Sequence, residues 1–599
     1  MLDIVTVIGV FVTVLTGIPV FLQLRSHPRG LSVLFFAEMW ERFSYYGMRG
    51  ILIFYLTEQF LFSDEFSQGQ YAAYTTLAYL LPLLGGYLAD RYLGTRKAIA
   101  FGALLLVAGH LTMAVEGKPA VQTLTYAGQT YSFQAKGRMQ GREVCLTVGQ
   151  GCYAVTAAKD GGMSITGLPA SAPLPQVLPK GGYSLKVEQR DPTFVNIFYL
   201  ALALIIMGVG FLKANISSIV GQLYKQGDPR RDPGFTLYYY GVNLGAFWAS
   251  VLCARLGQSF GWWAGFGLAG IGMLAGFAVF TWGKPLLEGH GEPPNPEALK
   301  KPIMGPLNLE VALYLVGLVG VAVVWWAVRH FGLMGRVQLV AWIAVLSYLA
   351  WYMVAKCDKV ARERLALALI LIFASIVFFT LFEQAGSSLN QFAERNTQMP
   401  NNGFWSISPG QTQSFNAGFI LIFAPVFAFV WAKLGQIGRD PNPAIKFGLG
   451  LVQVGLGFVA LVWGSQFHDA AFRVPLMFLV VAYLLHTTGE LCLSPVGLSE
   501  MTKLAPPALI STILAVWFLA SSAAQFLAGL VATLTASETV AGQVLDPGRA
   551  LATYVDTFRN IGLVGIGVGV AMLVASPWLN KLAHGVNDAD NHPAPDTMV

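Results

Sequence analysis

Charged residues are scarce in this chain of 599 residues. Asp, Glu, Lys and Arg make up 12% of it, which is about half the share usual in a soluble domain. Hydrophobic residues make up 55%, and the mean hydropathy is +0.57. This composition excludes a soluble globular protein. The net charge of +6 is small for this length and lies in short loops, and no nucleic-acid-binding motif occurs, so we expect no nucleic-acid partner.

The sequence also lacks the motifs of enzymes and of ATP-driven pumps. It has no Gly-rich phosphate loop followed by Lys and Ser or Thr, no paired metal-ligand histidines and no nucleophile elbow. An ATPase motor is therefore excluded, and we predict neither an enzyme nor a bound metal or cofactor. If the protein moves a solute across the membrane, the energy has to come from an ion gradient.

Apolar segments fill most of the chain, and each is long enough to cross the hydrocarbon core of a bilayer. They predict an all-α polytopic membrane protein with about fifteen transmembrane helices. The segments cover residues 4–24, 31–61, 71–89, 98–115, 193–220, 235–257, 261–282, 307–328, 337–355, 365–389, 414–435, 444–465, 474–498, 508–534 and 556–580.

Lys and Arg collect in short loops that fall on one side of the membrane if the helices alternate. By the positive-inside rule this side is the cytoplasm, which also receives the C-terminal tail. The first helix is followed by basic residues and not preceded by them, so we interpret it as a retained helix and not as a signal peptide. The loop with Arg329 and Arg336 falls outside and is a mild violation. The basic loops cover residues 91–97, 225–231, 356–364 and 433–446.

Residues 116–192 form the longest stretch without a membrane segment, and the alternation places it outside the cytoplasm. Runs at 123–133, 143–155 and 183–187 alternate with a period near two between Gly-rich breaks, which predicts a small β-rich domain. Cys145 and Cys152 lie in it; they are two free thiols or a disulfide, and an oxidising compartment with hairpin spacing favours the disulfide. The other three cysteines are interpreted as small apolar residues.

Four charged side chains between residues 38 and 49 interrupt the apolar segment 31–61. At about 100° per residue, Glu38, Arg42, Tyr45 and Arg49 share one helical face, and Glu41 lies on its flank. Charge is costly inside a membrane, so this face has to meet a partner or a water-filled cavity. An internally paired structural cluster is the alternative, and we favour a functional one.

Three motifs carry a resemblance to a known family: ExxERFxYYG at 38–47, GYLADRYLGTRK at 86–97 and GELCLSPVG at 489–497. By these motifs the chain resembles the proton-dependent oligopeptide transporter (POT) family of the major facilitator superfamily. The first and third are specific to the family, whereas the second indicates only the superfamily. The resemblance covers about 31–580 without the insert. One departure is YYYGVNLGA at 238–246, which keeps Asn243 but has Ala246 where the family commonly has Ser.

The resemblance implies two six-helix halves around a cavity at the membrane midplane. It makes 307–355 a pair of accessory helices, and it gives no role to the first helix or to the insert. The predicted division of the chain is an extra helix at 1–30, a first half at 31–115 and 193–283, an insert at 116–192, a linker with the accessory helices at 284–363, a second half at 364–580 and a tail at 581–599.

The same resemblance, together with the charges, suggests which residues act. Glu38, Glu41 and Arg42 are expected to form a proton-coupling cluster with Lys213, although a lysine that reaches toward the interface is the alternative. Glu383 is expected to join coupling or gating. Asp90 and Arg96 are expected to form a cytoplasmic latch.

Substrate polarity follows from the distribution of charge inside the spans. The first half carries an excess of positive charge, and the second half carries only the acids Glu383 and Glu490. This arrangement suits a zwitterion, with its carboxylate toward Arg49 and Lys213 and its ammonium toward Glu490. The expected cavity lining is Tyr46, Tyr79, Asn243, Asn416, Ser494 and Trp517. For the two Asn residues of this set there is an alternative, because an Asn between helices often makes only a hydrogen bond that supports helix packing.

The predicted function is proton-coupled symport of di- and tripeptides across a bacterial inner membrane by a monomer, with the proton as coupling ion. Burial raises the proton affinity of a carboxylate and a nearby cation lowers it, so breaking an ion pair can switch that affinity. Two alternatives stay open: a transporter of other solutes, such as nitrate or peptide-like drugs, and a non-transporting peptide sensor that uses the insert. The retained glutamate pair argues against a nitrate specialist, and the full charged set argues against a sensor.

Overall fold

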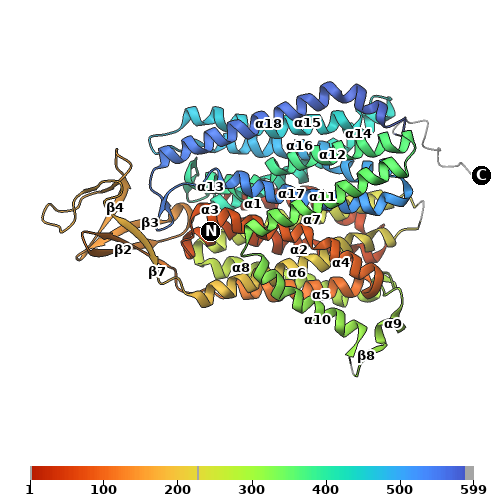
Figure 1. Ribbon diagram of the computed structural model, residues 1–599, viewed down its shortest axis with the longest axis horizontal. Helices are drawn as coiled ribbons and strands as arrows, with labels where there is room; N and C mark the ends of the chain where they lie inside the picture. The colour runs from red at the N-terminus through yellow and green to blue at the C-terminus, as the bar shows by residue number, and fades with distance from the viewer. Residues whose placement is uncertain (1–2, 226–227, 306, 587–599) are drawn as a thin grey trace, which may run out of the picture.

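The computed structural model describes residues 3–225, 228–305 and 307–586. Its helices run side by side in one bundle, and a β-rich segment projects from one end (Figure 1). Among the described residues, thirteen helices are long and apolar enough to cross a membrane, and α2 (Arg29–Phe54) and α7 (Arg231–Phe260) add two of 26 and 30 residues. The predicted fold class is confirmed. Residues 587–599, most of the predicted tail, lie outside the described residues.

The first half of the bundle surrounds one apolar core, whose buried residues run from Leu24 to Met334. Two of its helices cross closely, because a Cβ added at Gly102 would lie 2.6 Å from the carbonyl oxygen of Gly208, and one at Gly208 2.7 Å from that of Gly102. Its elements are α2, η1 (Tyr55–Gln59), α3 (Asp64–Leu80), α4 (Pro82–Leu88), η2 (Ala89–Leu93), α5 (Thr95–Met113), α6 (Pro192–Gln222), α7 and α8 (Trp262–Trp282).

The second half has its own core, from Leu349 to Ala583. Its first span is not the single helix predicted over 365–389, because a 3₁₀ turn interrupts it at Glu383–Gly386. The elements are α12 (Lys359–Phe382), η5 (Glu383–Gly386), α13 (Ser388–Arg395), η6 (Pro409–Gln413), α14 (Ser414–Gln436), α15 (Pro443–Gly464), η7 (Ser465–Phe467), α16 (Leu476–Leu504), α17 (Ile510–Thr533) and α18 (Pro547–Leu582). The break places Glu383 in the turn between α12 and α13.

Three further helices pack on the outside of the two halves. Helix α1 (Ile4–Leu24) lies against α7 of the first half and α14 of the second. Accessory helix α10 (Leu309–Ala327) packs on α6, and α11 (Phe331–Ala355) packs on α3, α12 and α17. Few of their side chains are buried, as expected for helices that face lipid. The short elements before α10 are α9 (Pro296–Lys300), β8 (Pro302–Met304) and β9 (Leu307–Asn308).

The insert folds as one antiparallel sheet of seven strands in the order β6-β5-β4-β3-β2-β1-β7. Each of the predicted runs 123–133 and 143–155 is a hairpin and not one strand. Ala127 and Gly128 both have positive φ, which fits the two-residue turns that match strand twist. The strands are β1 (Val121–Tyr126), β2 (Gln129–Lys136), β3 (Glu143–Val148), β4 (Gly151–Ala157), β5 (Met163–Ile165), β6 (Val177–Leu178) and β7 (Ser184–Glu188).

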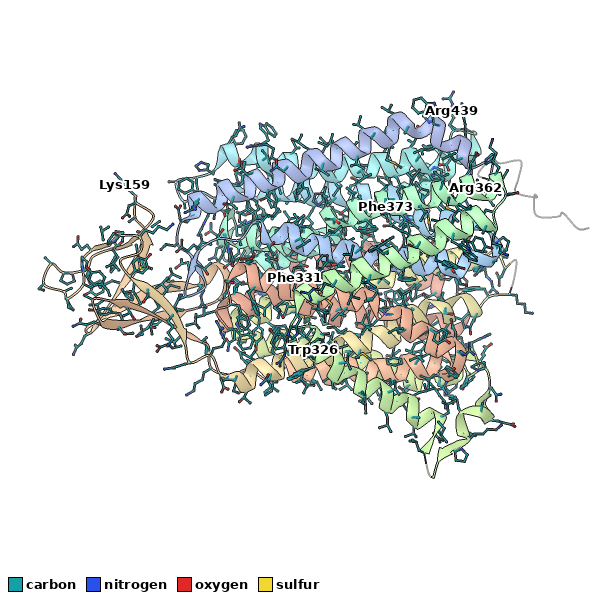
Figure 2. The ribbon with its side chains drawn as sticks, viewed as in Figure 1. Lys159, Trp326, Phe331, Arg362, Phe373 and Arg439 are labelled. Atoms are coloured by element: carbon teal, nitrogen blue, oxygen red, sulfur yellow. A yellow bond between two sulfur atoms is a disulfide. The ribbon has the colours of Figure 1, made fainter. Side chains whose placement is uncertain are left out.

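A disulfide joins Cys145 of β3 to Cys152 of β4, with 5.4 Å between the two Cα atoms. The basic loops 356–364 and 433–446 lie at the far end of the bundle, since Arg362 and Arg439 are opposite Lys159 of the insert (Figure 2). Arg329 lies toward the insert, because its Nη2 donates to Oδ1 of Asn196, near the start of α6, at 2.6 Å. We call the end of the bundle that carries the insert the insert end.

Candidate functional site

The charged residues of α2 form a buried cluster. Nε of Arg42 donates to Oε1 of Glu38 at 2.8 Å and lies 3.2 Å from Oε2 of Glu41. Both carboxylates are buried, and both oxygens of Glu41 lack a hydrogen-bond partner in the described residues. One guanidinium therefore faces two carboxylates, and the excess of acid is a place where a proton can bind.

Lys213 of α6 lies beside this cluster but is not paired with a carboxylate in the described residues. Its Nζ lies 3.4 Å from the ring centroid of Tyr79 and 5.8 Å from that of Tyr45, and it has no hydrogen-bond partner there. An ammonium over an aromatic face is held by the ring quadrupole. The predicted pairing of Lys213 with the α2 glutamates is therefore not seen here, because Tyr79 takes that position. Its buried nitrogen argues against a lysine that reaches the interface.

Arg49 joins the two halves. Its Nη2 lies 2.5 Å from Oε2 of Glu383, and its Nε donates to the hydroxyl of Tyr71 at 2.7 Å. The guanidinium also lies 5.7 Å from the ring centroid of Tyr46. Sequence reasoning assigned Arg49 to the peptide and Glu383 to coupling, whereas the structure makes them one buried ion pair.

The acidic residue of α16 has a different environment. Oε2 of Glu490 accepts from Nδ2 of Asn416 at 3.3 Å, and the same nitrogen donates to Oγ1 of Thr487 at 3.0 Å. The described residues place no Lys or Arg within ion-pair distance of Glu490. This carboxylate thus has an amide neighbour and no counter-ion.

The other residues expected to line a cavity have mixed surroundings. Asn243 donates to the carbonyl of Tyr239 in its own helix at 2.9 Å. This contact fits the alternative in which the Asn makes only a structural hydrogen bond. The ring of Trp517 lies against the backbone at Gly497, where a Cβ would collide with it. Ser494, one turn before Gly497, is partly exposed.

Asp90 and Arg96, the residues of the predicted cytoplasmic latch, do not pair with each other in the described residues. Arg96 instead donates to both carboxylate oxygens of Glu292, at 2.7 and 3.1 Å. Asp90 is exposed. The hydrogen bonds from Arg96 hold the pKa of Glu292 below its usual range. The latch partner comes from the linker after the sixth core helix, which the loop motif at 86–97 does not include.

The two halves are held together at the insert end. Arg395 of α13 binds both oxygens of Asp64 at 2.5 and 2.8 Å, and Gln68 donates to Gln391. Further from this end, in the middle of α17, Oγ of Ser522 donates to the carbonyl of Thr76 at 2.9 Å. These contacts join α3 to α13 and α17, so this end of the interface is closed.

Helix α1 adds a contact at the same end. Asp3, which caps α1, is fully buried; it pairs with Arg255 of α7 and accepts from Nε2 of Gln411 at 3.1 Å. The extra helix is therefore attached to both halves.

Comparison with known proteins decides the family. The sequence profile of the POT family matches residues 96–546. The chain belongs to the POT family. The motif at 38–47 lies before the matched stretch, so it supports the assignment independently.

Several members of the POT family resemble this one over almost their whole length. The uncharacterized transporter YclF of Bacillus subtilis is 32% identical over 94% of this chain and 96% of its own. Dipeptide and tripeptide permease B of Aeromonas hydrophila is 30% identical over 94% and 95%. A crystal structure of a POT peptide transporter with sulfate is 31% identical, with a TM-score of 0.68 over 93% of this chain and 96% of that one. The family is one of peptide transporters and not of enzymes.

Sequence reasoning missed the residues that close the insert end of this POT-family protein. Asp64 follows Ser63, which accepts from the amide of Phe66 at 3.3 Å, so the pair looks like an ordinary helix start. Arg395 looks like a basic residue at a helix end. The sequence does show that Asp64 and Arg395 lie at the ends of apolar segments in different halves. This position alone does not predict that the two side chains form an ion pair.

Proposed function

We propose that this POT-family protein is a proton-coupled symporter of di- and tripeptides in a bacterial inner membrane. It works by alternating access, as a monomer, with the proton as its coupling ion. The observation that carries this proposal is the buried ion pair between Arg49 and Glu383, because it joins the two halves and each of its groups can bind one of the two ligands, the peptide carboxylate at Arg49 and the proton at Glu383.

The coupling of proton and peptide follows from charge. A proton on Glu383 removes the negative charge that holds Arg49, and the freed guanidinium can then bind the carboxylate of an incoming peptide. Peptide and proton thus favour the same rearrangement of the interface. A ligand shifts such an equilibrium only by its different affinity for the two states, and this pair supplies the difference.

The α2 cluster supplies the second proton site of the proposal. Glu41 shares the single guanidinium of Arg42 with Glu38, and Lys213 lies near by on Tyr79. Movement of Lys213 from the tyrosine ring toward Glu41 would favour the ionised carboxylate, and the reverse movement would favour the protonated one. This exchange ties the charge of Glu41 to the positions of α2, α3 and α6.

The polarity of the substrate follows from the two ends of the site. Arg49 is the cation that can be released toward a carboxylate, and Glu490 is the acid without a counter-ion in the described residues. We place the peptide's ammonium at Glu490 and Asn416 and its carboxylate at Arg49. Tyr46 and Trp517 offer aromatic surface for variable side chains.

Uptake into proteoliposomes tests the proposal. We expect labelled di- and tripeptides to accumulate when the outside is acidic, and only to equilibrate when both sides have the same pH. A free amino acid of the same composition is the control for ligand size. Peptide accumulation that is independent of the proton gradient would contradict symport.

A second candidate is transport of other small zwitterions. The structure of one 27% identical POT relative contains 5-aminolevulinic acid, and that of a 30% identical mutant contains alafosfalin. A site that binds charges of both signs has no strict need for a peptide bond. Competition of these two compounds with dipeptide uptake distinguishes a broad range from a narrow one.

A further inference from the structure

The insert is anchored to the first half. Nε and Nη2 of Arg190 donate to the carbonyls of Phe60 and Leu61 at 2.7 and 3.0 Å. The amide of Met139 donates to both oxygens of Glu58, at 3.0 and 3.1 Å. Glu58 lies in η1, at the end of α2. These contacts join the insert to the half in which it is inserted.

The insert also contacts the second half by hydrogen bonds. Arg142 donates from Nη2 and Nε to the carbonyl of Ala541 at 2.7 and 3.0 Å. Nε2 of Gln140 donates to the carbonyls of Thr397 and Glu394 at 3.1 and 3.3 Å. The amide of Ala541 donates to Oε1 of Gln122. Ala541 belongs to the α17–α18 loop, and Glu394 belongs to α13.

Apolar contacts strengthen the same interface. Val540, Ala541 and Leu545 of the α17–α18 loop are buried in the apolar core of the insert, which includes Leu124 and Leu146. The amide of Ala157 donates to the carbonyl of Leu545 at 3.2 Å. The loop therefore completes the core of the sheet, and separating the two would expose apolar surface to water.

Arg142 is shared between the halves. While it binds Ala541 of the second half, its Nη2 also donates to the carbonyl of Glu58 at 3.3 Å, and its Nη1 lies 3.6 Å from the Glu58 carboxylate. The side chain is 8% exposed and Glu58 is 1% exposed. Withdrawal of the loop would remove the carbonyl of Ala541, which accepts two hydrogen bonds from this buried guanidinium, and leaving such donors without an acceptor is costly.

We infer that the insert is a clasp that holds the insert end of the transporter closed. The inference rests on the proposed alternating access, in which the halves separate at this end to admit substrate. The insert is attached to the first half and contacts the α17–α18 loop and α13 of the second half. Each separation of the halves at the insert end therefore has to break these contacts. The clasp thus shifts the equilibrium toward the state that is closed at the insert end.

Distance measurement between spin labels tests the clasp on the full chain in lipid nanodiscs. The labels replace Phe260, at the end of α7, and Phe467, in η7 just after α15, which are 67% and 52% exposed. The three free cysteines, Cys253, Cys357 and Cys492, are replaced first, whereas the disulfide in the insert stays. The ratio of long to short distances then measures how often the insert end is open.

The test variant is Arg142→Ala combined with Gln140→Ala, which removes side-chain hydrogen bonds between the insert and the second half. We expect the open-to-closed ratio to rise about tenfold, equivalent to about 1.4 kcal/mol. The matched control is Arg190→Ala, which also removes two hydrogen bonds from an insert arginine to backbone carbonyls, but only within the first half. We expect the control to keep the distances of the parent.

Two results would overturn the clasp: an unchanged ratio in the double variant, or an equal rise in the control. If the double variant does not elute as one species, Gln122→Ala removes a single contact to Ala541 and is expected to shift the ratio in the same direction; an unchanged ratio there also overturns the clasp. The measurement needs no transport, so these results leave the proposed symport untouched. Loss of gradient-driven uptake by the parent would contradict the symport instead.

Discussion

Glu490 is expected to bind the ammonium group of a peptide. The other intramembrane acids named in the site already face arginine, since Glu383 lies 2.5 Å from Arg49 and Glu41 lies 3.2 Å from Arg42. Glu490 accepts only from the amide of Asn416, at 3.3 Å, in the described residues. A carboxylate surrounded by protein without a cation is costly, and a substrate ammonium would relieve that cost.

The perturbation is Glu490→Gln, which keeps the shape and a hydrogen-bonding oxygen but removes the charge. Truncation of one partner of a buried charge pair costs about 2–5 kcal/mol, and we expect a loss in this range for a free-amine dipeptide. This corresponds to an increase in Kd of about 30-fold to several thousand-fold. An N-acetylated dipeptide has no ammonium, so it should bind the parent weakly and lose little affinity on substitution.

Isothermal titration calorimetry of both peptides against parent and variant measures the difference. All titrations use one pH, because Glu490 can itself take up a proton. Glu363→Gln is the matched control, since this acid lies near the start of α12 and pairs with His584, away from the site. Equal losses for the free and the acetylated peptide would refute the reasoning and assign Glu490 to the fold or to the proton path.

Three further predictions concern the coupling cluster, the insert and the closed end. Glu41→Gln should abolish gradient-driven accumulation but keep peptide exchange at equal pH; full accumulation would remove Glu41 from the mechanism. Cys145 and Cys152 should resist alkylation until a reductant is added, as mass spectrometry of labelled protein can show, and labelling without reductant would contradict the bridge. Asp64→Asn should lower the unfolding free energy by about 3–5 kcal/mol, because it removes the carboxylate that binds the buried Arg395 most closely and leaves only Glu394, at 3.5 Å. The added change Arg395→Gln should restore part of the loss in thermal unfolding, and no restoration would show that the pair is not the cause.

The sequence alone identified the membrane spans, the β-rich insert and the charged cluster of α2. These features depend on local patterns: a run of apolar residues as long as the bilayer is thick, a period of two in the insert, and a period of 3.6 that places Glu38 and Arg42 one turn apart. The Arg42 to Glu38 contact at 2.8 Å follows directly from that spacing. The same local rules did not resolve the hairpins at 123–133 and 143–155, because turns of two residues hardly interrupt the alternation.

Only the tertiary structure decided which distant groups meet. Arg49 and Glu383 are 334 residues apart, and Asp64 and Arg395 are 331 apart, so no local pattern connects them. Arg96 binds Glu292 and not Asp90, and Lys213 lies on Tyr79 and not on Glu41, because packing of the helices sets which partner is within reach. The grip of the insert on the α17–α18 loop depends in the same way on the halves being closed. Local sequence determines whether a segment forms a transmembrane helix or a strand, whereas the relative position of the two halves determines which distant side chains it contacts.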